Sequence, residues 1–133
     1  MPHVSCRQAL LVGLVAALLL GGGCDRRRNV TVTGSVLRGG KAIALSPTGY
    51  LQVTLQPDVG ADEQFTTRVG RCEKDGTFKI VEVPPGKYKI GVEQFDPNPQ
   101  TDKFNGAFRA GDSKIIRDID GKAPLTIDLA KPE

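Results

Sequence analysis

Apolar and polar residues alternate along most of this chain, and the alternation is most regular between residues 77 and 92. Within that segment the apolar residues that follow the alternation are Phe78 and Ile80 before residues 84–86, and Tyr88, Ile90 and Val92 after them. A period of two is typical of a strand with one buried face. Asp75-Gly76 favours a type I′ turn before the segment, and residues 84–86 (Pro-Pro-Gly) interrupt it. The pattern therefore predicts a β-hairpin over residues 74–92.

The same alternation predicts strands elsewhere in the chain. They are expected at residues 30–36, 51–56, 64–73 and 125–130, with a further short strand near residues 115–116. No stretch after residue 24 has the apolar spacing of an amphipathic helix. About seven short strands without helices predict an all-β fold, an antiparallel two-sheet Greek-key sandwich, in which burial of the inward-facing side chains stabilises the domain.

The segment from 96 to 112 interrupts this regular pattern. It opens with a cluster of turn residues at 96–100 and carries Phe104 and Phe108 among glycine and polar residues. A loop of this length inside a compact domain is either functional or poorly ordered. The two phenylalanines either pack over one end of the sandwich or offer an exposed apolar contact, and packing is favoured. This loop remains the first candidate for binding a partner.

The first 23 residues are predicted to be a signal peptide that begins with a short apolar helix. The apolar run at residues 9–20 has the length of a signal-peptide core and is too short to span a bilayer. Residues 21–24 (Gly-Gly-Gly-Cys) resemble the lipobox of bacterial lipoproteins. That resemblance implies cleavage before Cys24 and acylation of its thiol. Alternatively, the signal peptide is cut elsewhere and Cys24 remains an ordinary thiol.

Residues 24–29 are expected to be a lipidated cysteine with a polar tether, followed by a domain at residues 30–131. Two or more acyl chains anchor a protein stably in a bilayer, whereas one anchors it marginally. The three arginines at 26–28 either lie against anionic headgroups or form a solvated part of the tether. These features predict an exported protein of the bacterial cell envelope, in the periplasm or at the outer surface.

The regular segment also carries a motif, D-G-x-F-x-I-x-x-V-P-P-G-x-Y-x-I. Its residues are Asp75, Gly76, Phe78, Ile80, Val83, Pro84, Pro85, Gly86, Tyr88 and Ile90. The motif resembles the signature of carboxypeptidase regulatory-like domains, and the opening strand at 32–36 with the glycine turn at 39–41 resembles the start of that family. The resemblance implies a transthyretin-like (prealbumin-like) β-sandwich with an accessory role. No catalytic residue is carried over.

Composition narrows the possible chemistry. The chain has 133 residues and a net charge of +3 without a clustered basic stripe, so a nucleic-acid partner is not expected. It has no tryptophan, which disfavours an aromatic platform for sugars or bases. The only histidine, His3, lies in the predicted signal peptide. Histidine-dependent nucleophiles and histidine-ligated zinc are therefore excluded from the domain, and no catalytic residue, cofactor or metal is predicted.

Three further features have an ordinary and a functional interpretation. Cys72 is expected to be a small core residue rather than a reactive thiol. Residues 118–121 (Asp-Ile-Asp-Gly) resemble the start of a calcium loop but lack its later ligands, so a turn is predicted. Lys79, Lys87 and Lys89 are expected to form an outward basic row that protects the predicted hairpin from edge pairing.

Together these observations predict a non-enzymatic lipoprotein, anchored in a membrane, that serves as a binding or structural module of the cell envelope. Its expected partners are the membrane and an envelope protein or a glycan. A carbohydrate-binding module at the cell surface is the alternative. A small hydrolase is disfavoured by the missing histidine, although mechanisms that use only carboxylates need none.

Overall fold

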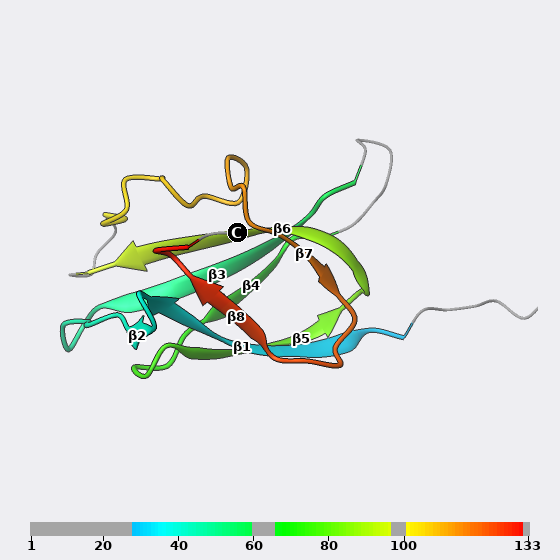
Figure 1. Ribbon diagram of the computed structural model, residues 1–133, viewed down its shortest axis with the longest axis horizontal. Coiled ribbons are helices and arrows are strands. Elements are labelled where there is room, and N and C mark those ends of the chain that lie inside the picture. The colour runs from blue at the N-terminus through cyan, green and yellow to red at the C-terminus, as the bar shows by residue number, and fades with distance from the viewer. Residues whose placement is uncertain (1–27, 60–65, 97–100, 132–133) are drawn as a thin grey trace, which may run out of the picture.

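The computed structural model describes residues 28–59, 66–96 and 101–131. Eight strands and no helix are present in this part of the chain (Figure 1). The strands are β1 (Val30–Arg38), β2 (Lys41–Ala42), β3 (Tyr50–Pro57), β4 (Arg68–Arg71), β5 (Thr77–Val83), β6 (Gly86–Phe95), β7 (Ile116–Ile119) and β8 (Leu125–Asp128). The all-β prediction is therefore confirmed. The predicted signal-peptide helix lies outside the described residues.

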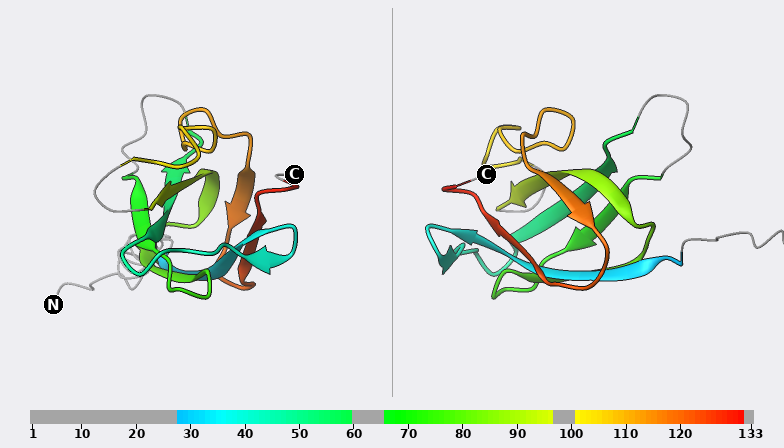
Figure 2. Two further views of the ribbon diagram at one scale, coloured as in Figure 1. Left: turned by 90° about the vertical axis from the view of Figure 1, so that its left-hand side faces the viewer. Right: turned by 45° about the vertical axis from the view of Figure 1, so that its right-hand side comes forward.

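The strands form two four-stranded sheets that face each other, as a β-sandwich requires (Figures 1 and 2). In the first sheet, β1 pairs with β2, β5 and β8, and the second sheet has the order β4-β3-β6-β7. One pairing differs from the antiparallel prediction, because β8 runs parallel to β1 in the register Gly34↔Leu125 to Leu37↔Asp128. A tight hairpin turn would have imposed antiparallel pairing, but β8 follows β7 of the opposite sheet, so its direction is set by that crossover.

The predicted hairpin over residues 74–92 is not formed, because its two strands belong to different sheets. β5 pairs with β1, whereas β6 pairs with β3 and β7. Residues 84–86 carry the chain from one sheet to the other, and the Tyr88 hydroxyl donates a 2.6 Å hydrogen bond to the Pro84 carbonyl at this corner. An alternating pattern looks the same for two paired strands and for two strands facing each other across a core. The pattern therefore identified the strands but misassigned their pairing.

The turn before β5 also differs from the type I′ prediction, since only Gly76 of the Asp75-Gly76 pair has a positive φ, at 86°. The Gly76 amide donates to the Glu73 carbonyl at 2.9 Å, and the Glu73 amide donates to Thr77 at 2.7 Å. The Asp75 carboxylate accepts hydrogen bonds from both the amide and the hydroxyl of Thr77, which lowers its pKa. This five-residue turn leads from β4 of one sheet into β5 of the other.

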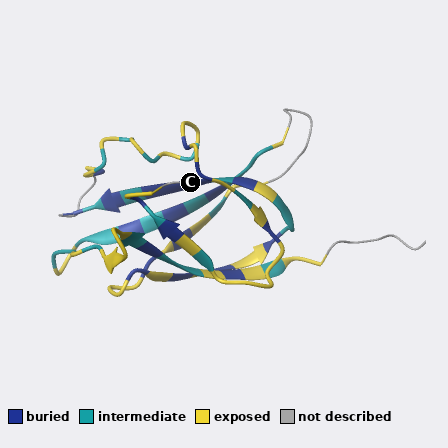
Figure 3. Ribbon diagram, viewed as in Figure 1, coloured by how far each residue is buried: buried dark blue, intermediate teal, exposed yellow. Residues whose placement is uncertain are grey.

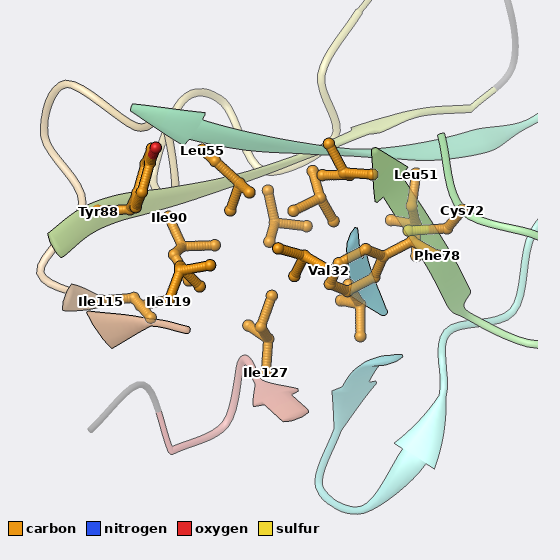
Figure 4. Packing of buried hydrophobic residues seen from close by; sticks show 14 of the residues in the cluster. Val32, Leu51, Leu55, Cys72, Phe78, Tyr88, Ile90, Ile115, Ile119 and Ile127 are labelled. Carbon is orange, nitrogen blue, oxygen red and sulfur yellow. The ribbon is translucent and has the colours of Figure 1, made fainter. Parts of the chain in front are cut away.

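Buried side chains from both sheets form one core (Figures 3 and 4). Its members are Val32, Val36, Leu51, Val53, Leu55, Cys72, Phe78, Ile80, Val83, Tyr88, Ile90, Val92, Ile115, Ile119, Ile127 and Leu129. Phe78, Ile80, Tyr88, Ile90 and Val92 are all among them, so the predicted inward face of the segment 77–92 is confirmed, whereas Val81 of the same segment is exposed. The strand expected at 64–73 is shorter, with β4 described only at Arg68–Arg71, and Val69 on it is exposed.

Candidate functional site

Phe104 and Phe108 lie half-buried in the loop that follows β6. Their rings meet edge to face with centroids 5.3 Å apart, and both pack against the core. The packing interpretation is confirmed, while a role for this loop in binding a partner stays a prediction. Residues 97–100 of the predicted loop lie outside the described residues.

This loop covers the edge of β6 that β7 leaves open. β7 pairs only with residues 86–89 of β6. Farther along that strand, the Ile90 amide donates to Ile115 and the Val92 amide donates to Phe108, both at 2.8 Å. An exposed strand edge would offer unpaired amides and carbonyls to other chains. The loop therefore completes the sheet.

Asp102 anchors the start of the covering segment. Its carboxylate is buried and accepts hydrogen bonds from the amides of Gln94 (2.9 Å), Phe104 (3.0 Å) and Gly106 (2.8 Å). The Lys103 amide donates back to the Gln94 carbonyl at 2.7 Å. An aspartate in a polar loop gives no local sign that its carboxylate is buried, and sequence reasoning did not single it out.

A second feature that the sequence did not reveal lies on the outer face of the β4-β3-β6-β7 sheet. Tyr50 of β3 and Phe95 of β6 are directly paired, and their rings stack with centroids 5.1 Å apart and an interplanar angle of 29°. The guanidinium carbon of Arg71, at the end of β4, lies 3.8 Å from the centroid of the Tyr50 ring. Arginine, tyrosine and phenylalanine from three adjacent strands thus form one stack.

Beside this stack is a surface depression of about 310 Å³, which we call the Arg71 depression. Its lining residues are Pro47, Thr48, Gly49, Tyr50, Arg71, Cys72, Glu73 and Lys74. The loop before β3 with its first residue, and the end of β4 with the turn after it, supply these residues, because β3 begins at Tyr50 beside the point where β4 ends at Arg71. Hydroxyl, carboxylate and cationic groups therefore gather around a small, mostly polar hollow.

One wall of the Arg71 depression is held in place by Asp96. Its buried carboxylate accepts a 2.9 Å hydrogen bond from the Ser46 amide and lies 3.8 Å from the Lys103 ammonium. Hydrogen bonding by Ser46 lowers the pKa of Asp96, so the carboxylate is ionised at neutral pH. A Cβ on Gly49 would lie 2.5 Å from the Asp96 carboxyl carbon, so only glycine allows this close approach.

Cys72 is buried in the core beside Phe78, as the sequence predicted (Figure 4). The pKa of its thiol is raised from 9.0 to about 12, mainly by burial and to a smaller extent by the nearby carboxylates of Asp75 and Glu73. The thiolate is the reactive form of cysteine. This environment makes Cys72 a poor nucleophile.

We expect Cys72 to resist thiol reagents in the native protein. In a chain carrying Cys6→Ser and Cys24→Ser it is the only thiol. Because its pKa rises from 9.0 to about 12, the thiolate fraction near neutral pH falls by about a thousandfold. Labelling with a chromogenic disulfide should be slow in buffer and complete in concentrated guanidinium chloride. Fast labelling of the folded chain would contradict the buried position.

The calcium-loop-like segment at 118–121 and the predicted row of lysines are the two remaining features of the sequence. The Asp120 carboxylate accepts a 2.9 Å hydrogen bond from the Lys122 amide, so residues 118–121 form part of a turn. Among the described residues, no three potential metal-ligating side chains gather. The predicted row of three lysines is not formed, because Lys79 lies on β5 of one sheet, whereas Lys87 and Lys89 lie on β6 of the other.

Comparison with protein-family models, curated proteins and solved structures finds no match for this chain. The resemblance to carboxypeptidase regulatory-like domains therefore stays a prediction. No helix in the described part of the chain is long and apolar enough to cross a membrane. The predicted signal peptide and the lipid-attachment residue Cys24 lie outside the described residues.

Proposed function

We propose that this protein is an exported lipoprotein, anchored in a bacterial envelope membrane through Cys24, whose β-sandwich is a non-catalytic binding or structural module. The apolar run at residues 9–20 and the glycine run that ends at Cys24 support the anchor. The absence of histidine after residue 3 supports a non-catalytic role. The proposed partners are the membrane and an envelope protein or glycan.

The observation that carries this proposal is the position of the Arg71 depression relative to Val30, where the first strand of the domain begins. β1 begins at Val30 at one end of the sandwich, and the start of β3 and the end of β4 lie at the other end (Figure 1). Residues of those two strand ends line the Arg71 depression. Cys24 precedes Val30 by only a short segment. An anchored chain would therefore present the depression away from the bilayer, where partners in the envelope can reach it.

We further propose that the sandwich is a transthyretin-like Greek-key domain of the carboxypeptidase regulatory-like kind. Its support is the position of the motif residues. Phe78, Ile80, Tyr88 and Ile90 are all buried, and the proline–glycine segment at 84–86 is the corner between the sheets. In this proposal the motif encodes a sheet-to-sheet corner with apolar residues on both sides of it.

Fractionation of the producing bacterium tests the anchor. The native chain is expected in the membrane fraction, with a mature N-terminus at Cys24 that carries acyl chains in mass spectrometry. Cys24→Ser should remove the acyl chains and move the protein to the soluble fraction, because stable anchoring needs those chains. Cys6→Ser is the matched control and should leave the protein on the membrane. An unacylated native N-terminus would contradict the proposal.

A specific observation also favours the alternative, a carbohydrate-binding module. The Arg71 depression offers a hydroxyl from Thr48, a carboxylate from Glu73 and cationic groups within one small hollow. Such groups can exchange hydrogen bonds with the hydroxyls of a sugar. The loop at 96–112 is the second candidate contact and would suit a protein partner through Phe104 and Phe108.

A further inference from the structure

We propose that the Arg71 depression binds a carboxylate-bearing sugar, a uronic-acid unit of an acidic polysaccharide, with Arg71 as the carboxylate-binding residue. This inference rests on the proposed role of the sandwich as a binding module and adds its ligand class.

Arg71 is prepared to bind an anion. Its guanidinium carbon lies 3.8 Å from the Tyr50 ring centroid, and Tyr50 in turn stacks with Phe95. A stacked guanidinium keeps the donors around its rim available, and their fork matches a carboxylate in two parallel hydrogen bonds. Among the described residues, no carboxylate lies within ion-pair distance of Arg71, whereas Arg109 pairs with Glu93 at 3.6 Å.

The stack also determines how a sugar would be held. The Tyr50 ring already contacts both Arg71 and Phe95, so it is not a free platform for a sugar ring. Recognition in this depression would therefore come from charge and hydrogen bonding. A ligand with one carboxylate and several hydroxyls has the matching chemistry, because Thr48 and Glu73 line the same hollow as Arg71.

Size and charge restrict the ligand further. The volume of about 310 Å³ is at the small end of known ligand sites, which begin at about 300 Å³. Arg71 and Lys74 supply two positive charges, and Glu73 supplies one negative charge in the same lining. This balance favours a singly charged carboxylate over a doubly charged phosphate monoester.

An acidic peptide fits this surface less well than a sugar. Peptides commonly bind by adding a strand to a free sheet edge or by placing apolar side chains in a groove. The edge strand beside the depression, β4, is only four residues long, and the part of β6 beyond β7 is covered by the loop that includes Phe108. Apart from Pro47, the stacked ring of Tyr50 and the buried Cys72, the lining of the depression is polar or glycine. The surface therefore lacks the apolar pocket that would hold a peptide side chain.

The depression is also rigid on the side that faces Arg71. The Gly49 amide donates to the carbonyl of Ser46 at 3.1 Å and to its hydroxyl at 3.2 Å, while the Ser46 amide binds Asp96. A wall fixed in this way loses little conformational freedom when a ligand binds.

Isothermal titration of the full chain in detergent, with trigalacturonic acid as the probe and neutral galactotriose as its counterpart, tests the inference. We expect the acidic trisaccharide to bind and the neutral one to bind at least about tenfold more weakly, because a charged hydrogen-bonded pair is lost. Arg71→Ala should weaken binding of trigalacturonic acid by about ten- to a hundredfold. Arg71→Lys should weaken binding less than Arg71→Ala does. Lysine keeps the positive charge, although it cannot make the two parallel hydrogen bonds of a guanidinium.

Lys79→Ala is the control, because it removes one positive charge from β5 at a residue that does not line the depression, and it should leave the affinity unchanged. Thermal unfolding of each variant checks that it is folded. If Arg71→Ala does not fold, the affinity of Arg71→Lys takes its place as the test. Equal affinity for the two trisaccharides, no binding, or an unchanged affinity in the Arg71 variants would overturn the inference. So would tighter binding of triglutamate in competition with the sugar. A chain that fails these titrations yet fractionates with the membrane through Cys24 loses only this inference.

Discussion

Replacing Phe78 with alanine is expected to lower the free energy of unfolding by about 3–5 kcal/mol. The ring is buried, and a Cβ on Gly34 of β1 would lie 2.6 Å from its tip, so the ring fills the space above that glycine. Its removal leaves a cavity between the sheets that neighbouring side chains can only partly fill. Because a whole domain is stable by about 5–15 kcal/mol, this loss should be plain in urea-induced unfolding.

Val81→Ala on the same strand is the matched control. Val81 is 55% exposed, and its truncation should change the free energy of unfolding by no more than about 0.5 kcal/mol. Because Phe78 lies on the inward face of β5 and Val81 does not, only Phe78→Ala should lower the free energy of unfolding strongly. Similar values for the two variants would contradict the packing of that strand.

Asp102→Ala is expected to destabilise the loop over β6 and to lower the free energy of unfolding by about 1–3 kcal/mol. The substitution leaves the amides of Gln94, Phe104 and Gly106 without their acceptor. The Gln94 amide is the most costly of the three, because its hydrogen bond is buried. Hydrogen exchange should therefore show faster exchange at Gln94 than in the native protein.

Asp112→Ala removes an exposed carboxylate from the same loop and is the control for lost charge. It should leave exchange at Gln94 and the free energy of unfolding unchanged. Asp102→Asn keeps one acceptor oxygen and should fall between the native protein and Asp102→Ala. Native exchange at Gln94 in Asp102→Ala would show that the carboxylate does not hold the loop against β6.

The candidate site was accessible to sequence reasoning only in part. Phe104 and Phe108 stood out because aromatic residues are conspicuous in a polar segment, and their packing against the core was predicted. Arg71 and Tyr50 lie 21 positions apart in the chain and meet only because β4 pairs with β3. In the sequence, Asp102 resembles any solvated aspartate of a loop, and only the fold shows that it lies beside Gln94 of β6. Contacts of this kind depend on which strands pair, and nothing local reports that.

The sequence by itself determined that the domain is all-β and that side chains such as Phe78, Ile80, Tyr88 and Ile90 face the core. It did not determine the bounds of β4, on which Val69 is exposed. The inward faces could be predicted because successive side chains of a strand point to opposite faces, so buried positions recur at every second residue. Tertiary structure alone decided that β5 and β6 face each other across the core, that β8 lies parallel to β1, and that Arg71 covers Tyr50. These arrangements depend on packing between distant segments, where the same local pattern is compatible with several pairings.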